Sequence, residues 1–294
     1  MGDVNPPASP LPPGGKVGYL GPAGTFTEEA LDFSGLPFQE TLPFTTVEEA
    51  ILAADRGEAD CAFVPIENSI EGSVNATLDA LAFDVEMFIQ RELVMPIRHL
   101  LVAKPGTDIA TISTVASHPQ ATAQCRRNLQ KLLPRARIIA ANSTAEAALA
   151  AAGSGGEAAA ICNGLAAELY GLAVLEEDLE DHPGNVTRFV LLGKQSMPPS
   201  GDDKSSMVCF IHADQPGSLL QILQEFAYRY INLSKIESRP TKKSLGDYVF
   251  FIDSDGHVEE EPLASALKCL NCKLRRVKLL GSYPRFMMAE DTGA

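Results

Sequence analysis

The sequence predicts an α/β protein of two units, a large one at about 16–195 and a small one at about 206–286. In the large unit, apolar strand-like runs alternate with helical patterns, which is typical of a mostly parallel sheet covered by helices. The small unit has the order β-α-β-β-α-β, which is that of a ferredoxin-like domain. Composition and charge change near residue 200, between the two units.

The change in charge supports this boundary. Residues 1–205 carry 13 Lys and Arg against 27 Asp and Glu, whereas residues 206–286 carry 11 against 9. Residues 196–205 are rich in Pro, Ser, Gly and Asp, so we expect a polar linker there. Residues 1–15 contain five Pro and three Gly, and we expect a disordered tail.

Composition and charge exclude several classes of function. With 294 residues, 45% of them hydrophobic, the chain can bury the cores of about two domains. A net charge of −14 argues against nucleic acid or an anionic membrane as the main partner. No apolar run reaches the roughly 18 residues that span a bilayer, and the first residues do not resemble a secretory signal. We therefore expect a cytoplasmic protein.

The six cysteines do not indicate a metal site, and in the cytoplasm we expect them to be reduced. Cys269 and Cys272 form the one C-x-x-C pair, and it lies in a helical pattern with no second pair and no nearby His. Because a structural zinc site needs four ligands, no metal is expected. A redox role for this pair is an alternative.

The elements of the large unit follow one pattern, in which a strand is followed by small polar residues and a helix. Val17–Leu20 is the first strand, and Thr25-Phe-Thr-Glu28 has the spacing of a capping box, so we expect a helix from Phe26 with Thr25 as its N-cap. The pattern recurs four times. Asp60–Val64 is followed by a helix through Leu81, and Thr114–Ser117 by a helix from Pro119 to about Leu133. Arg137–Ala140 is followed by a helix that begins after the capping box Ser143–Glu146, and Ala158–Cys162 by a helix after Gly164.

Two long extended runs, Leu93–Ala103 and Asn185–Gly193, flank the middle of the large unit. We expect them to be the two crossings between a pair of lobes with a cleft between them. Lobe one would comprise residues 16–95 and 185–195, and lobe two residues 100–180.

Small polar residues cluster where strands end and helices begin. In parallel sheets these positions share one edge, where helix N-termini bind anions. A small anionic ligand is therefore one interpretation, and simple capping of each helix is the other. For His118 the alternatives are a turn or helix-start residue, which we expect, and a proton donor. For Glu67 they are a solvated carboxylate, which we expect, and a general acid if the side chain is buried. The candidate ligand-binding residues are Thr25, Asn68, Ser69, Ser73, Gln120 and Ser143.

The small unit is expected to contain four strands and two helices. Asp214-Gln-Pro-Gly217 ends the first strand and opens the first helix at Ser218. The expected strands are Ser206–Ala213, Asn232–Arg239, Tyr248–Asp253 and Arg275–Ser282, and the expected helices are Ser218–Tyr228 and Glu261–Leu270.

Short motifs follow one another in order along both units. Those of the large unit are Gly21-Pro-Ala-Gly-Thr-Phe26, Pro65-Ile-Glu-Asn-Ser69 with Gly72-Ser73, Ser117-His-Pro-Gln-Ala121 with Gln124-Cys125, and Asn185-Val-Thr-Arg-Phe189. Those of the small unit are Pro216-Gly-Ser-Leu219 and Glu237-Ser-Arg-Pro240. Together, the motifs of the large unit resemble the prephenate dehydratase family, and the small unit resembles the ACT amino-acid-sensing domain. The resemblance implies a two-lobed catalytic domain with a type II periplasmic-binding-protein fold, followed by the ACT domain.

The resemblance also implies an activity. The family converts prephenate to phenylpyruvate, water and carbon dioxide without a metal or organic cofactor. Its ACT domain binds phenylalanine at a dimer interface, so a homodimer or homotetramer is expected. We expect phenylalanine to close or lock the catalytic cleft, with a coupling of about 1–3 kcal/mol. The residues implied for this site are Pro216, Gly217, Ser218, Leu219, Asn232, Leu233, Glu237 and Ser238.

By the resemblance, Thr187 is the essential catalytic residue. A threonine hydroxyl does not titrate near neutral pH, so we interpret Thr187 as a placed donor to the departing hydroxyl. We expect Arg188 to hold the pyruvyl carboxylate, because its planar fork matches a carboxylate. The alternatives are a strand residue for Thr187 and a surface salt bridge for Arg188. Phe189 is expected to pack in the core or to contact the substrate ring.

Three other functions are left open by the sequence. Arogenate dehydratase is the close alternative, because arogenate differs from prephenate in carrying an amino group in place of the keto group. A non-catalytic amino-acid sensor with a binding-protein fold would bind a ligand without turnover. A redox function of the cysteine pair is the third.

Overall fold

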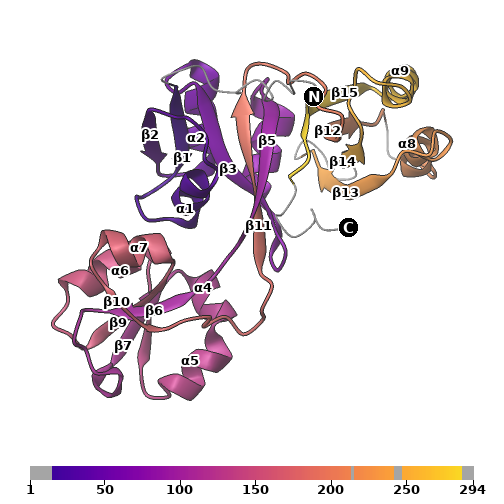
Figure 1. Cartoon of the computed structure of the whole chain (residues 1–294). Helices are drawn as coiled ribbons and strands as arrows, with labels where there is room; N and C mark the ends of the chain where they lie inside the picture. The colour runs from indigo at the N-terminus through magenta and orange to yellow at the C-terminus, as the bar shows by residue number, and fades with distance from the viewer. Residues whose placement is uncertain (1–14, 213–214, 242–246, 287–294) are drawn as a thin grey trace, which may run out of the picture.

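The structure, a computed structural model, describes residues 15–212, 215–241 and 247–286 (Figure 1). Apart from Gly15, the expected tail lies outside the described residues. The described chain forms three sheets, two in the large unit and one in the small unit. Figure 1 shows the two lobes of the large unit joined by two crossings of the chain, with the third sheet beside lobe one.

Lobe one contains a mixed sheet in the order β2-β1-β3-β11-β5. Its first three strands run parallel, and β11 is antiparallel to both of its neighbours. The strands are β1 (Lys16–Leu20), β2 (Glu40–Phe44), β3 (Cys61–Asn68), β4 (Gly72–Ser73), which pairs with β3, β5 (Phe88–Pro96) and β11 (Val186–Gly193), and the helices are α1 (Phe26–Phe33), α2 (Val47–Arg56), α3 (Asn75–Asp79) and the π-helical turn η1 (Ala80–Asp84).

Lobe two contains a second mixed sheet, in the order β10-β6-β9-β7-β8. The strands are β6 (Leu100–Ala103), β7 (Thr114–Ser117), β8 (Arg137–Ala140), β9 (Ala158–Cys162) and β10 (Ala173–Glu176), and the helices are α4 (Pro119–Gln124), α5 (Arg126–Leu132), α6 (Thr144–Gly153), α7 (Gly164–Leu169) and the short 3-10 helix η2 (Ile109–Thr111).

The expected strands and caps of the large unit form, with two differences. The run Leu93–Ala103 is split into β5 and β6, and the chain crosses between the lobes at the three residues between them. The expected helix Pro119–Leu133 is divided into α4 and α5 at Cys125, whose backbone leaves the helical region at φ −107° and ψ 6°. Both lobe sheets are mixed because the crossing strands run antiparallel to their neighbours.

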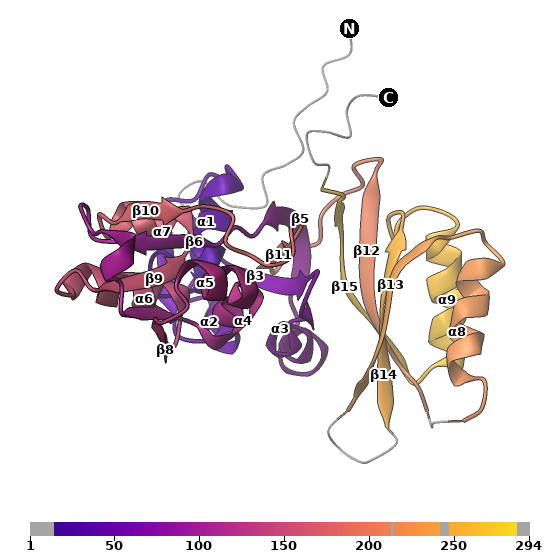
Figure 2. The same ribbon diagram turned by 90° about the horizontal axis from the view of Figure 1, so that it is seen from below.

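The small unit has the ferredoxin-like order that the sequence predicts, and its sheet follows the order β13-β14-β12-β15. Figure 2 shows α8 and α9 on the outer face of this sheet, away from the large unit. The elements are β12 (Asp203–Phe210), α8 (Ser218–Ala227), β13 (Leu233–Pro240), β14 (Tyr248–Asp255), α9 (Leu263–Lys273) and β15 (Arg276–Pro284).

The two units share a hydrophobic core. Residues 196–202 of the expected linker lie in no helix or strand, and its last three residues, 203–205, are the start of β12. Val190 and Ile89 of lobe one pack in one cluster with Phe251 of the small unit. At Gly281 the strands approach so closely that an added Cβ would lie 2.3 Å from the carbonyl oxygen of Ile89.

Among the described helices, none has the length and apolar character needed to cross a membrane.

Candidate active site

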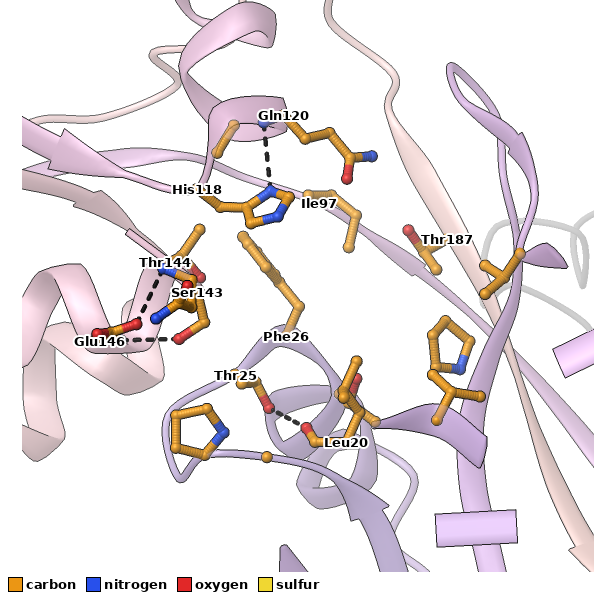
Figure 3. A pocket seen from close by; sticks show the side chains of 18 of the residues that line it. Leu20, Thr25, Phe26, Ile97, His118, Gln120, Ser143, Thr144, Glu146 and Thr187 are labelled. Carbon is orange, nitrogen blue, oxygen red and sulfur yellow. Dashed lines mark hydrogen bonds between the residues drawn. The ribbon is translucent and has the colours of Figure 1, made fainter. Parts of the chain in front are cut away.

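A cavity of about 810 Å³ lies between the two lobes (Figure 3). Lobe one lines it with the first turn of α1 and the end of β3, and lobe two with the first turns of α4 and α6. The start of β11 forms another wall. Among the described residues that line the cavity, Glu146 is the one acid, and none is Lys or Arg.

Two helix N-termini, one from each lobe, supply positive potential to this cavity. Thr25 caps α1, since its Oγ accepts a hydrogen bond from the backbone N–H of Glu28 at 3.4 Å and donates to the carbonyl of Leu20 at 2.8 Å. Ser143 caps α6 and accepts from the backbone N–H of Glu146 at 2.9 Å. Both caps agree with the capping boxes in the sequence, and Figure 3 shows the two residues across the cavity from Thr187.

Thr187 lies on β11 at the wall of the cavity, where its side chain is 7% exposed. In Figure 3 its hydroxyl points toward the middle of the cavity. Asn68 at the end of β3 is its register partner, and Asn68 Nδ2 lies 2.8 Å from Thr187 Oγ1. Phe189, two residues further along the same strand, also lines the cavity and stacks on Phe63 in the core.

His118 and Gln120 reach the cavity from α4. The Nδ1 of His118 accepts from the backbone N–H of Gln120 at 3.3 Å, so His118 caps this helix, as its position in the sequence indicated. A neutral ring that accepts at Nδ1 carries its proton on Nε2. Gln120 is exposed and lines the cavity.

His99 is a cavity residue that sequence reasoning missed, because it lies inside a long apolar run. It is 3% exposed, its ring meets Phe26 edge-on at 5.4 Å, and its Nε2 lies 3.0 Å from Gln124 Oε1. Burial lowers the pKa of His99, while the bond to Gln124 raises it, and the net shift is downward. His99 is therefore neutral near neutral pH. Gln124 and Asn185 belong to motifs recognised in the sequence, but only the structure assigns them to the cavity.

Arg188 does not line the cavity, and the expectation that it binds a substrate carboxylate is corrected. Side chains alternate along a strand, so Arg188 points away from the face that carries Thr187. Its guanidinium is buried against the small unit, 2.7 Å from Asp253 Oδ2 and 2.6 Å from the hydroxyl of Tyr283. Its Nε lies 2.8 Å from Glu92.

Further ion pairs surround Arg188 between the two units. Lys204 pairs with Glu92 at 2.8 Å, and Lys235 pairs with Glu67 at 3.2 Å. Glu67 also lies 3.6 Å from Arg188. Three cations thus face the carboxylates of Glu67, Glu92 and Asp253, and the expectation of a merely solvated Glu67 is corrected.

Two other candidate residues lie outside the cavity. Ser73 is hydrogen-bonded to Glu237 and, at 2.6 Å, to Lys235, so it joins the large unit to β13. Ser73 therefore contacts the small unit and not the cavity. Ser69 is exposed, and its Oγ accepts from the backbone N–H of Val186 at 3.0 Å, which supports the start of β11.

The small unit has a second cavity, of about 380 Å³, at the N-terminus of α8. Of the residues expected at the phenylalanine site, it is lined by Gly217, Ser218 and Leu219. Gly217 has φ +90° at the N-cap of α8, a conformation that favours glycine. Pro216 adjoins this turn.

The other residues expected at the phenylalanine site, which lie in β13 or directly before it, do not line this cavity. Asn232 is instead hydrogen-bonded to Asp255 at 3.2 Å, and Leu233 packs in the core of the small unit. Glu237 faces the large unit, where it is hydrogen-bonded to Ser73. Ser238 is exposed on the same strand.

Comparison with known proteins decides the family. The family model for prephenate dehydratase matches residues 17–197, and the model for the ACT domain matches residues 207–269. The chain belongs to the prephenate dehydratase family. A prephenate dehydratase from Mycolicibacterium vanbaalenii is 41% identical over 284 residues, which cover 91% of this chain and 90% of the relative.

Solved structures agree with this assignment. The crystal structure of an Arthrobacter aurescens prephenate dehydratase in complex with L-Phe has a TM-score of 0.85 and 43% identity, covering 92% of this chain and 90% of its own. A structure named GqqA, described as a novel type of quorum quenching acylase, has a TM-score of 0.83 and 30% identity, covering 92% and 98%. Solved structures similar to this chain are therefore described with more than one activity.

Proposed function

We propose that this chain is a cytoplasmic prephenate dehydratase of phenylalanine biosynthesis, and that Thr187 donates to the departing hydroxyl. The observation that carries the proposal is the Thr187 hydroxyl, which points into the cavity between the lobes with Asn68 at 2.8 Å. Loss of carbon dioxide and hydroxide makes the ring aromatic, so the reaction is downhill. The protein has to orient the substrate and assist the leaving oxygen.

The charge of the cavity suits a dianion that loses one carboxylate. The N–H groups at the starts of α1 and α6 can hold a carboxylate without a cation. A guanidinium on the leaving carboxylate would stabilise the ground state and oppose decarboxylation. The described residues of the wall include no Lys or Arg, which avoids this cost.

We assign substrate contacts to the polar residues that line the cavity, and ring contact to Phe189. Thr25 and Ser143 present the two helix N-termini, and Gln120 reaches in from α4. These residues lie on different lobes, so a bound substrate would bridge the lobes and favour their closure.

Prephenate is favoured over arogenate by the same wall. Arogenate carries an ammonium group, which needs an acceptor of negative charge. The one carboxylate among the described lining residues, that of Glu146, already accepts from the backbone N–H of Asn142 at 2.9 Å beside the start of α6. A keto group makes no such demand.

Acyl transfer is not favoured by this cavity, although one structural relative is described as an acylase. Such chemistry usually needs a hydroxyl activated by a neighbouring base. Ser143 and His118 are both engaged as helix caps, each with a backbone N–H of its own helix.

For regulation, we propose that phenylalanine binds at the turn Gly217–Leu219 and that a second copy of the chain completes the site. The cavity there is open at the surface, its lining residue Leu220 is 57% exposed, and Ile236 on β13 is 46% exposed. A dimer through the small units would cover them. The expected assembly is a homodimer or a homotetramer made of two such dimers. Sedimentation with and without phenylalanine measures its mass.

The activity is tested by turnover of prephenate and arogenate in parallel, with the wild type and Thr187→Ala. We expect phenylpyruvate from prephenate, much slower release of phenylalanine from arogenate, and loss of both in the variant. Binding of prephenate without turnover would instead support the non-catalytic sensor.

A further inference from the structure

The amide of Asn68 is held in one orientation by the backbone that follows it. Its Oδ1 accepts from the N–H groups of Ile70 at 2.9 Å and Glu71 at 3.0 Å. Backbone N–H groups can only donate, so this end of the amide must be the oxygen. The NH₂ end therefore faces Thr187, and Thr187 Oγ1 is the acceptor of the bond between them.

A chain of side-chain amides extends the same direction into lobe two. Asn68 Nδ2 also donates to Asn185 Oδ1 at 2.8 Å, and Asn185 Nδ2 donates to Gln124 Oε1 at 3.1 Å. Gln124 Nε2 then donates to the carboxylate of Glu71 at 3.2 Å. Backbone donors fix one end of the chain and a carboxylate acceptor fixes the other, so an amide could flip only by losing hydrogen bonds.

This direction determines where the proton of Thr187 can go. A hydroxyl has one proton, and the Thr187 oxygen already accepts from Asn68. In the described part of the chain, the hydrogen bonds of Thr187 include no acceptor for that proton. Because the hydroxyl points into the cavity, a bound ligand is the partner left for its proton (Figure 3). Donation to the oxygen also makes the O–H a better donor, because hydrogen bonds in a chain polarise one another.

We propose that Asn68 is a positioning residue that sets the Thr187 hydroxyl as a donor toward the leaving oxygen of the substrate. The proposal rests on the proposed dehydratase function and adds to it the group that orients the donor. It differs from the two simpler roles of Asn68, which are direct contact with substrate and support of the turn at residues 69–71.

Two substitutions separate these roles. Asn68→Asp keeps the oxygen that accepts from Ile70 and Glu71 and replaces only the NH₂ by a second oxygen. The new carboxylate accepts the Thr187 proton and turns it away from the cavity. Asn68→Ala removes the turn contacts as well, but leaves the hydroxyl free to rotate toward the ligand.

We expect kcat for prephenate to fall about 100-fold in Asn68→Asp at neutral pH and less in Asn68→Ala, with KM changed by less than about threefold in both. The ratio of wild-type to Asn68→Asp kcat should shrink as the pH falls, because a protonated carboxyl can again donate to Thr187. A role in the turn alone predicts the opposite order, with Asn68→Ala the more damaged, and no change of this ratio with pH.

Thermal unfolding of each variant shows whether it is folded. If Asn68→Asp does not fold, Asn68→Ala decides alone, and an unchanged kcat overturns the proposal. If the wild type converts prephenate but Asn68→Ala is more damaged than Asn68→Asp, as a role in the turn alone predicts, this inference is wrong and the proposed function stands. A wild type that does not convert prephenate removes both.

Discussion

Arg188 of β11 and Asp253 of β14 are hydrogen-bonded at 2.7 Å across the boundary between the large and the small unit. Arg188 follows Thr187 directly in the chain, so one peptide unit lies between the proposed donor and a residue held by the small unit. Asp253 also accepts from Ser206 on the neighbouring strand at 2.6 Å. A movement of the small-unit sheet would therefore reach the backbone of Thr187 through a buried side chain.

We expect Asp253→Asn to weaken the response to phenylalanine. The substitution removes the charge by which the small unit holds Arg188, while Glu92 and Glu67 of the large unit remain. The effect of saturating phenylalanine on kcat/KM should therefore shrink by the fivefold or more that about 1 kcal/mol of coupling represents. Dose–response curves with prephenate measure this.

Arg276→Gln is the matched control. Arg276 forms an exposed ion pair with Glu86 across the same two units, at 2.9 Å, but it does not contact β11. We expect an unchanged phenylalanine response in this variant. An equal loss in both variants would mean that the coupling does not pass through Arg188.

Arg188→Met should lower stability and leave substrate affinity nearly intact. Removing one partner of a buried ion pair typically costs about 3–5 kcal/mol, because the remaining carboxylates are left uncompensated. Denaturant unfolding measures this loss. At a temperature where the variant is folded, KM for prephenate should stay within about threefold of the wild type. A large rise in KM with unchanged stability would restore Arg188 as a substrate ligand.

Gly281→Ala should separate the two sheets. An added Cβ would meet the carbonyl of Ile89 at 2.3 Å, and Gly281 has φ +146°. Such overpacking typically costs about 1–3 kcal/mol of unfolding free energy. Gly256→Ala is the control, because Gly256 has φ +95° and a Cβ added there would meet nothing within 4 Å, so this variant tests the backbone cost alone. Equal losses in the two variants would argue against a tight contact at Ile89.

Glu29 gives the fold a pH dependence. It accepts from Asn163 of lobe two at 3.2 Å, and burial raises its pKa more than its hydrogen bonds lower it. Because the pKa of Glu29 is higher in the folded than in the unfolded chain, protonated Glu29 favours the folded state, and its contribution to stability is complete at low pH. It is lost as the pH rises from about 4 through the raised pKa. Glu29→Gln should flatten this part of the stability curve in urea unfolding at stepped pH, and an unchanged slope would contradict the assignment.

Local chemistry made much of the fold predictable. Thr25 and Ser143 were found because a cap and its partner lie three residues apart in the chain. The strand at β2 and the helix α2 were not assigned, although Thr46 caps α2 in the same way and accepts from Glu49 at 3.1 Å. The signal for that helix was therefore present in the sequence.

The errors concern contacts between distant segments. Alternation along β11 implies that Thr187 and Arg188 face opposite sides, but not that the small unit covers the Arg188 side. Ser73 and Glu237 are 164 residues apart, and only the docking of the two units brings them together. His99 carried no local signal, since an apolar run usually indicates core packing.

The central claim is that the Thr187 hydroxyl assists loss of the substrate hydroxyl in the cavity between the lobes. The most direct test is kcat for prephenate in Thr187→Val and Thr187→Ser. We expect Thr187→Val, which keeps the shape without the hydroxyl, to lose about 100-fold or more at unchanged melting temperature, and Thr187→Ser to retain most of the activity. A Thr187→Val enzyme with wild-type kcat would contradict the claim.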